Sequence, residues 1–449
     1  MPGLARFPEG FLWGAATSAY QIEGAPLADG AGPSNWHRFS HLEGAIENGD
    51  TGDVACDHYH RYAEDVERMR QLGLGAYRFS IAWARVMPEG RGAVNSKGLD
   101  FYARLVDRLL ENDIVPAPTL YHWDLPAALE DRGGWVNPDS PGWFQDYARV
   151  VFERLGDRVP MWATLNEPIL VSHAGYVLGI HPPGHRSAAE AAAVARHLLL
   201  AHGAAVEAYR GTAKHAIGLV LNLEPRVPAS DSARDAEATR RADIYYNQQY
   251  LDTVITGQWP AGLAEILGPA CRELTPRESA RVAQPLDWLG VNYYSRRPTV
   301  HGADPPLHAD DVAIEGAPST DLGWEIHPSG LTEILVRVAE RTGKLPLYVT
   351  ENGAAYIDPD PDPSGVVEDA RRAEYLRQHL AACREAIDRG VDLRGYFVWS
   401  LLDNFEWQRG YSQRFGIIHV DYATQKRTIK QSGYFYRDAI AANGVTLSR

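Results

Sequence analysis

Two glutamates stand where buried strands are expected to end. Glu167 directly follows the apolar run at residues 161–166, and Glu351 follows the run at 345–350. Near-continuous apolar runs are typical of parallel strands covered on both faces, so these carboxyls are expected at strand ends rather than on a solvated surface. Two such carboxyls can cleave a glycosidic bond. One protonates the departing oxygen, and the other, ionised, attacks or stabilises the sugar carbon.

The elements that must position these carboxyls alternate between strand and helix. Amphipathic runs predict helices, the clearest at residues 367–389, and a second that ends at Gly73. Eightfold alternation favours the α/β class, as a single (β/α)8 TIM barrel with extended βα loops. An open doubly wound sheet is the alternative, disfavoured because no Gly-rich phosphate turn follows the first strand. The predicted strands are residues 11–16, 76–81, 115–121, 161–166, 217–222, 288–293, 347–351 and 395–401.

Composition narrows the classes of protein and of partner. We expect residues 1–449 to form a single barrel domain, because no linker or internal repeat is visible. The net charge of -14 disfavours nucleic acid and anionic membranes as partners. The three cysteines form no CxxC pair, and His58 and His60 lie two apart on a predicted helix, so we expect local packing for these histidines and no metal. No signal-peptide pattern or membrane-length apolar run occurs, which predicts a cytoplasmic protein unless a leader has been removed.

Polar residues cluster after the predicted strands, where (β/α)8 barrels gather their active sites. The segments are Gln21 and Glu23, Arg78 and Ser80, residues 122–124, Asn166 and Glu167, residues 292–295, Glu351 and Asn352, and residues 399–407. This distribution predicts one site at the C-terminal mouth of the barrel.

Four segments carry a resemblance to a known family: FLWGAATSAYQIEG at residues 11–24, TLNEP at 164–168, TENG at 350–353 and DNFEW at 403–407. They resemble glycoside hydrolase family 1, over residues 11 to about 435. The resemblance implies a retaining, exo-acting β-glucosidase that cleaves terminal non-reducing β-D-glucosyl residues of cello-oligosaccharides and aryl or alkyl β-glucosides. It works through a covalent glycosyl-enzyme intermediate and needs no cofactor. β-Galactosidase or β-fucosidase side activity, transglycosylation, and a monomer or homo-oligomer all stay open.

The resemblance also implies roles for individual residues. Glu167 would be the general acid and base, and Glu351 the nucleophile. Support for catalysis is expected from Arg78, Asn166, Asn292 and Tyr294. Substrate contacts are expected from Gln21, His122, Trp123, Asn166, Trp324, Trp399, Glu406 and Trp407, with Trp399 as stacking platform and Trp324 on the leaving-group side beside residues 181–184 and 303–321.

Structural interpretations of the same residues compete with these roles. Arg78 could form a structural salt bridge, Trp399 and Trp123 could be core residues, and His122 a satisfied buried histidine.

Alternative functions depend on single positions. Relatives that cleave 6-phosphoglycosides carry Ser in place of Glu406 with Lys and Tyr downstream, whereas this chain has Gln413 before Arg414. Thioglucosidases carry Gln in place of Glu167. A catalytically inactive sugar-binding protein is a further alternative, because fold alone does not establish activity. Such a protein has no need for both Glu167 and Glu351, so the sequence favours the β-glucosidase.

Overall fold

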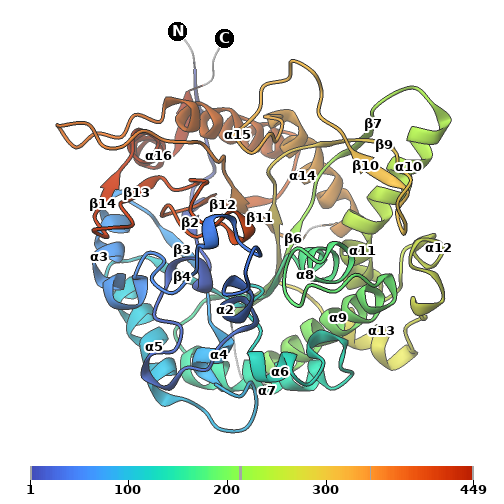
Figure 1. Cartoon of the computed structure of the whole chain (residues 1–449). Helices are drawn as coiled ribbons and strands as arrows, with labels where there is room; N and C mark the ends of the chain where they lie inside the picture. Colours follow the sequence, from blue (N-terminus) through green and yellow to red (C-terminus); the bar gives the residue numbers. More distant parts are fainter. Residues whose placement is uncertain (1–2, 212–214, 344, 447–449) are drawn as a thin grey trace.

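The computed structural model describes residues 3–211, 215–343 and 345–446. Eight parallel strands close into a barrel, which Figure 1 shows at the centre of the molecule. They are β2 (Leu12–Ala16), β3 (Ala76–Ser80), β4 (Val115–Tyr121), β5 (Met161–Asn166), β6 (Ala216–Asn222), β8 (Trp288–Asn292), β11 (Leu347–Asn352) and β12 (Leu393–Trp399). All eight predicted strands are confirmed. The open-sheet alternative is wrong, because β11 pairs with both β12 and β8 and so completes the ring.

Long helices surround the barrel, as Figure 1 shows. They are α3 (His58–Gln71), α5 (Ser96–Leu110), α7 (Ser140–Leu155), α9 (Ala188–Arg210), α11 (Gln249–Thr256), α14 (Pro328–Thr342), α15 (Ala370–Asp388) and α16 (Gln431–Ala442). The predicted helix that ends at Gly73 is α3. Its apolar face buries Val66 and Met69 against the barrel, and Gly73 adopts φ +70°, a left-handed conformation that ends helices readily.

Further elements elaborate the loops between the barrel strands and helices. The other α-helices are α1 (Ala19–Ile22), α2 (Asn35–Ser40), α4 (Trp83–Val86), α6 (Ala127–Glu130), α8 (Pro168–His173), α10 (Ala233–Asp243), α12 (Leu263–Leu267) and α13 (Pro276–Val282). Small sheets pair β1 (Leu4–Arg6) with β15 (Gly444–Thr446), β9 (Arg297–His301) with β7 (Arg226–Pro228) and β10 (Ala309–Asp311), and β13 (Ile418–Val420) with β14 (Arg427–Ile429). The expected extended βα loops are therefore present.

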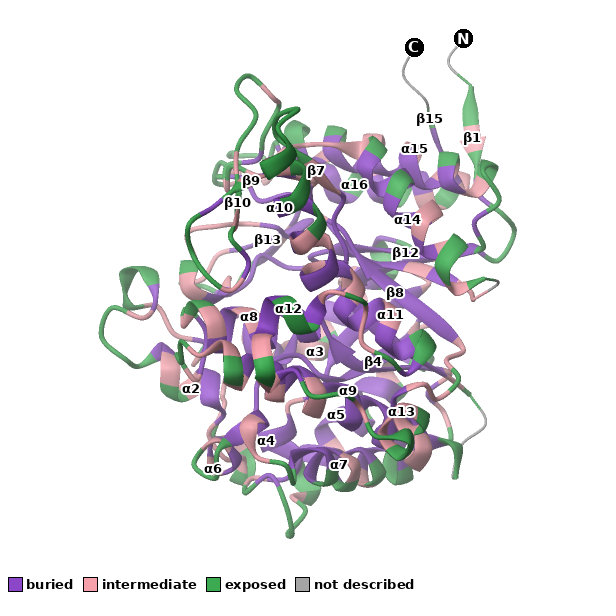
Figure 2. Cartoon of the chain, turned by 90° about the vertical axis from the view of Figure 1, so that its right-hand side faces the viewer, coloured by how far each residue is buried: buried purple, intermediate pink, exposed green. Residues whose placement is uncertain are grey.

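The barrel interior is packed rather than hollow. Figure 2 shows the barrel strands almost wholly buried and most exposed residues in loops and outer helix faces. A cluster of buried side chains that includes Met161, Val220, Trp288 and Phe397 fills the inside of the barrel. Gly218 gives Trp288 its space, because a Cβ there would lie 2.5 Å from the indole ring. No helix in the described ranges is long and apolar enough to cross a membrane.

Candidate active site

A cavity of about 310 Å³ opens at the C-terminal ends of the barrel strands and contains both predicted glutamates. Its size and mixed polar and aromatic lining are typical of small-molecule sites. The predicted residues that line it are His122, Trp123, Glu167, Tyr294, Trp324, Glu351, Trp399, Glu406 and Trp407. Gln21, Arg78, Asn166 and Asn292 are buried and contact residues of this lining.

Glu167 stands at the junction between β5 and α8, where Pro168 begins the helix. Its backbone adopts φ +45°, and two other cavity residues, Trp123 and Trp407, also have positive φ, at 80° and 52°. This conformation costs a residue with a large side chain on the order of 1–3 kcal/mol, so it persists only where the surrounding structure enforces it. Three such residues in one cavity indicate that the fold positions these side chains at the expense of local backbone energy.

Glu351 lies in β11 and accepts two short hydrogen bonds. Nη1 of Arg78 donates to its Oε1 at 2.7 Å, and the hydroxyl of Tyr294 donates to its Oε2 at 2.7 Å. Arg78 is 2% exposed, so solvent screens its attraction to Glu351 only weakly. Both donors favour the ionised form of Glu351.

Asn166 and Asn292 connect the two glutamates through one hydrogen-bond network. The Asn166 side-chain oxygen accepts from Nη2 of Arg78 at 2.7 Å and from Nδ2 of Asn292 at 3.1 Å. The same Asn292 nitrogen donates to Oε1 of Glu167 at 2.6 Å. These five side chains come from the middle of β3, from β5, β8 and β11 at or near their C-terminal ends, and from the residue after β5, so barrel closure assembles the network.

The two carboxyls differ in their affinity for a proton. Burial raises the pKa of Glu167 well above its ordinary value, the negative charge of Glu351 raises it further, and only Asn292 and the more distant Arg78 oppose this. Burial also raises the pKa of Glu351, but Arg78, Tyr294 and Asn292 all pull it back. The pair therefore holds its last proton on Glu167 and its negative charge on Glu351. Two neighbouring carboxyls with unequal environments suit one acid and one nucleophile.

His122 presents a hydrogen-bond donor to the cavity. The Asn166 amide nitrogen donates to Nε2 of His122 at 3.1 Å, so the proton of a neutral ring resides on Nδ1. That Nδ1 is buried and has no hydrogen-bond partner within the described part of the chain. Burial, followed by the charge of Arg78, lowers the pKa of His122 well below its usual range and keeps it neutral. A sugar hydroxyl is a suitable acceptor for this free donor.

Tryptophans form one wall of the cavity. Trp399 stacks on His122 with ring centroids 5.8 Å apart, and Trp407 packs on Trp123 at 4.7 Å. Nε1 of Trp123 donates to the Asn166 backbone oxygen at 2.9 Å. An apolar aromatic face beside free polar groups matches a sugar, which has both C–H faces and hydroxyls.

Glu406 lies at the end of the cavity next to Gln21. Nε2 of Gln21 donates to Oε2 of Glu406 at 3.3 Å and to the Phe405 backbone oxygen at 2.8 Å. Asn404 donates to the same Glu406 oxygen at 3.3 Å. Burial raises the pKa of Glu406 to about 8, with opposition from Asn404 and a further contribution from the charge of Glu351. Gln21 therefore holds Glu406, while Glu406 itself faces the cavity.

Several lining residues escaped prediction. They are Leu170, His173, Ala174, Leu178, Ile180, Asn222, Glu224, Arg297, Leu322, Gln408, Arg409 and Phe415. Glu224 and Arg297 form a bidentate ion pair at 2.9 and 3.0 Å, although they belong to different loops far apart in sequence. Asn222 could have been found, since it is the polar residue at the end of the predicted strand 217–222.

The expected leaving-group side is only partly as predicted. Trp324 lines the cavity and packs against Tyr294 with centroids 5.4 Å apart, and His181 from the segment 181–184 also lines it. The cavity lining includes none of the residues 303–321, whose strand β10 instead pairs with β9.

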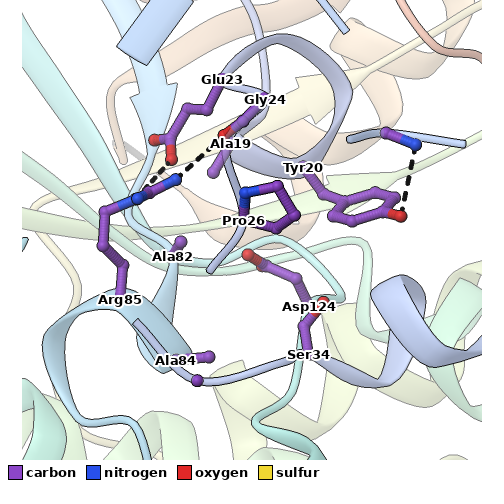
Figure 3. A pocket seen from close by; sticks show the side chains of 12 residues that line it. Ala19, Tyr20, Glu23, Gly24, Pro26, Ser34, Ala82, Ala84, Arg85 and Asp124 are labelled. Atoms are coloured by element: carbon purple, nitrogen blue, oxygen red, sulfur yellow. Dashed lines mark hydrogen bonds and ion pairs between the residues drawn. The ribbon is translucent and has the colours of Figure 1, made fainter. Parts of the chain in front are cut away.

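Two other predicted groups lie away from the cavity. Glu23, which was predicted at the C-terminal mouth of the barrel, accepts from Nε of Arg85 at 3.0 Å and from the Tyr102 hydroxyl at 2.7 Å. Figure 3 shows its ion pair with Arg85 beside a separate small cavity. His58 is buried against Asp65, with 2.7 Å between Nδ1 and Oδ2. His60, expected to pack, is instead exposed, and its Nδ1 lies 2.6 Å from Oδ1 of Asp57, because the two histidines face different sides of α3.

A (β/α)8 barrel with two buried carboxyls and an aromatic wall in one strand-end cavity has the features of a glycoside hydrolase. The sequence profile of glycosyl hydrolase family 1 matches residues 4–445, and the chain belongs to that family. It is 48% identical over 444 residues to a protein named beta-glucosidase A of Thermotoga maritima, covering 98% of this chain and 99% of that protein.

Two further comparisons agree with this assignment. A protein named 1,4-beta-D-glucan glucohydrolase of Thermotoga neapolitana is 48% identical over 449 residues, covering 99% of this chain and 100% of that protein. The structure of a family 1 β-glucosidase from Thermotoga maritima in complex with isofagomine lactam is similar to this chain with a TM-score of 0.95 and 48% identity. The two structures align over 99% of this chain and 100% of the other.

Proposed function

We propose that this protein is a retaining, exo-acting β-glucosidase, with residues 1–449 as one catalytic domain. The observation that carries the proposal is the unequal pair of buried carboxyls, of which Glu351 has two strong donors and Glu167 one. The names of the relatives, beta-glucosidase and 1,4-beta-D-glucan glucohydrolase, support glucosides and cello-oligosaccharides as substrates.

In the first step Glu351 attacks the anomeric carbon and Glu167 protonates the glycosidic oxygen. The bond to the leaving group breaks as a covalent glycosyl ester forms on Glu351. Arg78 and Tyr294 keep Glu351 ionised until the attack, and the burial of Glu167 keeps its proton available. We expect the two carboxyls to stand about 5–5.5 Å apart when a sugar is bound, the separation that retention requires.

In the second step Glu167, now ionised, takes a proton from water, which attacks the ester. Glu351 leaves as a carboxylate, and Arg78 and Tyr294 stabilise its returning charge. Because a sugar hydroxyl can replace that water, transglycosylation is compatible with the same site.

The sugar is held by hydroxyl contacts and by stacking. His122, Asn166, Trp407 and Glu406 are proposed to bind its hydroxyls, with Gln21 positioning Glu406, while Trp399 stacks on its apolar face. Trp123 holds the tryptophan wall in place, because it packs on Trp407 and donates a hydrogen bond to the Asn166 backbone oxygen. Trp324 is proposed to contact the leaving group. The Thermotoga maritima structure in complex with isofagomine lactam supports a small sugar-like ligand here.

The alternative of a 6-phospho-β-glucosidase is less well supported. A phosphate needs free cationic donors, whereas Arg414 is engaged, donating to Asp403 at 2.6 Å and to the Val420 backbone oxygen at 3.0 Å. Glu406 lines the cavity and would repel a phosphate when ionised.

Both a monomer and a homo-oligomer are compatible with this proposal. We also propose a cytoplasmic location, which the three free, buried cysteines support, since such thiols are typical of reducing compartments.

A substrate panel tests the proposal. Cellobiose, p-nitrophenyl β-glucoside, its galactoside and its 6-phospho derivative would be compared by kcat/KM, and we expect the glucoside and cellobiose to be hydrolysed. Exclusive turnover of the 6-phospho derivative would establish the phosphoglycosidase instead. Binding of glucose without turnover of any substrate would establish the sugar-binding protein.

A further inference from the structure

Outside the active-site cavity, three potential metal ligands gather around α2 and the loop that follows it. His37 lies in α2, His41 caps the helix, and Asp53 comes from the loop that leads to α3. One ligand atom from each lies within 4.8 Å of the others. Nδ1 of His37 is 3.3 Å from Oδ1 of Asp53, and Nε2 of His41 is 3.1 Å from Oδ2 of Asp53. The catalytic mechanism uses none of these groups.

The three side chains lie close enough together to share one zinc ion. Zinc binds imidazole nitrogen and carboxylate oxygen at about 2.0–2.2 Å in a tetrahedral arrangement, whose edge is about 3.3 Å. The two imidazole–carboxylate separations of 3.3 and 3.1 Å are near this value, although they end on different oxygens of Asp53. Because one ligand atom from each residue lies within 4.8 Å of the others, small side-chain rotations would bring all three onto one ion.

The tautomer of His41 places a lone pair against a carboxylate. Its Nδ1 lies 2.7 Å from the backbone oxygen of His37. A carbonyl oxygen can only accept, so this Nδ1 carries the hydrogen. Nε2 of a neutral His41 is then an acceptor, and it faces Asp53, which is also only an acceptor when ionised. Two facing acceptors need a cation between them, either a proton or a metal ion.

His37 shows a related mismatch. Its Nδ1 and Oδ1 of Asp53 are both buried, and neither has a hydrogen-bond partner among the described residues, despite a separation of only 3.3 Å. A buried polar atom without a partner calls for a physical explanation, and a bound ion is one that suits two facing ligand atoms.

We propose that His37, His41 and Asp53 bind one Zn²⁺ ion, with solvent as the fourth ligand. Two imidazoles and a carboxylate form a ligand set that zinc accepts readily. The side chains of His41 and Asp53 are 44% and 43% exposed, which gives the ion a route in and leaves a coordination position open to water.

Zinc at this site would stabilise the tryptophan wall of the sugar cavity from the side that faces away from the sugar. Trp36 in α2 packs on Trp407 with centroids 4.4 Å apart. Next to Asp53 in the chain, the Gly52 backbone nitrogen donates to the hydroxyl of Tyr20 at 3.4 Å, the contact drawn as a dashed line at Tyr20 in Figure 3. The ion would tie α2 to the Asp53 loop, and so restrain the layer behind Trp407. Its role is structural, because it does not reach the reacting atoms.

Zinc titration of the metal-stripped full-length protein tests this site. Isothermal calorimetry with ZnCl₂ should give one ion per chain in the wild type. His41→Ala and Asp53→Asn should weaken binding at least about tenfold, since even outer-shell changes cost this much. The matched control is His60→Ala, which removes an exposed histidine paired with Asp57 but lacking a third ligand; it should bind zinc like the wild type.

Two further measurements keep the result unambiguous. Co²⁺ in place of Zn²⁺ should give the visible absorption of a tetrahedral site in wild type and His60→Ala, and lose it in His41→Ala. Zinc should raise the Tm of the wild type and not of the Asp53→Asn variant. Equal zinc affinity in wild type and His41→Ala, or no saturable binding by the wild type, would overturn the proposal. The cluster would then be a protonated imidazole–carboxylate pair.

Discussion

Replacing Tyr294 with Phe removes one hydrogen bond from the proposed nucleophile and little else. The Tyr294 hydroxyl donates to Glu351 at 2.7 Å, while its ring packs against Trp324 and Phe415 with centroids 5.4 and 6.1 Å away. Phe retains the ring and therefore the packing. A hydrogen bond to a charged group contributes about 1.5–3 kcal/mol, which corresponds to a rate change of about 10- to 100-fold.

We expect this loss in the second chemical step, where Glu351 departs as a carboxylate and needs its donors most. The glycosyl-enzyme should then accumulate, so kcat should fall about 10- to 100-fold while KM falls as well. Stopped-flow mixing with 2,4-dinitrophenyl β-glucoside, whose departure needs little acid assistance, should show a burst of phenol before the slow steady state.

The pH profile gives an independent readout. The Tyr294 hydroxyl lowers the pKa of Glu351, so its removal should raise that pKa and move the acidic limb of kcat/KM to higher pH. Glu351 also raises the pKa of Glu167 through its charge. Because Glu351 is already ionised over the basic limb, that limb should keep its position, and the profile should narrow from its acidic side.

Tyr293→Phe is the matched control. Its hydroxyl donates to the His327 backbone oxygen at 2.6 Å and not to a carboxylate, so its pH profile should stay at the wild-type position. An unchanged profile for Tyr294→Phe, a shift of the acidic limb to lower pH, or equal effects of both substitutions would refute the assignment of Tyr294.

Three further substitutions separate the remaining roles. Glu351→Ala should abolish hydrolysis, and azide should partly restore it with a glycosyl azide of inverted configuration by NMR; a product of retained configuration would contradict its role as nucleophile. Glu167→Ala should slow cellobiose at least about 100-fold more than dinitrophenyl glucoside, because only the poor leaving group needs the proton; equal losses would remove the acid assignment. Glu406→Ser should raise KM for p-nitrophenyl β-glucoside about tenfold or more, since it removes a hydroxyl partner; an unchanged KM would place Glu406 outside the sugar site.

The barrel and its two glutamates could be predicted because their signal is local. Each strand is a short apolar run buried on both faces, and each glutamate follows such a run. The ends of helices and strands were predicted less well where contacts with distant parts of the chain determine them. The helix predicted from residue 367 begins at Ala370, because the Val367 backbone oxygen accepts from the Gln431 nitrogen at 3.0 Å and Asp369 accepts from the Ser432 nitrogen at 2.7 Å.

The last strand shows the same limit of local sequence. It was predicted two residues late at both ends, since the apolar run continues beyond it. Leu393 pairs with Leu347 in β11, whereas Leu402 has left the barrel and bridges to Ile418 in β13. The pattern of apolar and polar residues does not show whether a given leucine pairs with β11 inside the barrel or with β13 outside it.

The parts of the site that depend on pairs of distant loops were beyond sequence reasoning. The ion pair of Glu224 with Arg297 joins the loops after β6 and β8, and neither residue adjoins a strong motif. Arg78, Asn166 and Asn292 were predicted as separate supporting residues, and not as one hydrogen-bonded network. Their mutual hydrogen bonds follow from barrel closure, which brings residues of three strands together.

The stereochemistry of the first product tests the central claim most directly. Hydrolysis of p-nitrophenyl β-glucoside would be followed by ¹H NMR at early times, before the glucose anomers interconvert. β-Glucose should appear first, because two displacements, at Glu351 and then by water, restore the starting configuration. Initial formation of α-glucose would contradict the account, since a single displacement by water would then replace the covalent intermediate on Glu351.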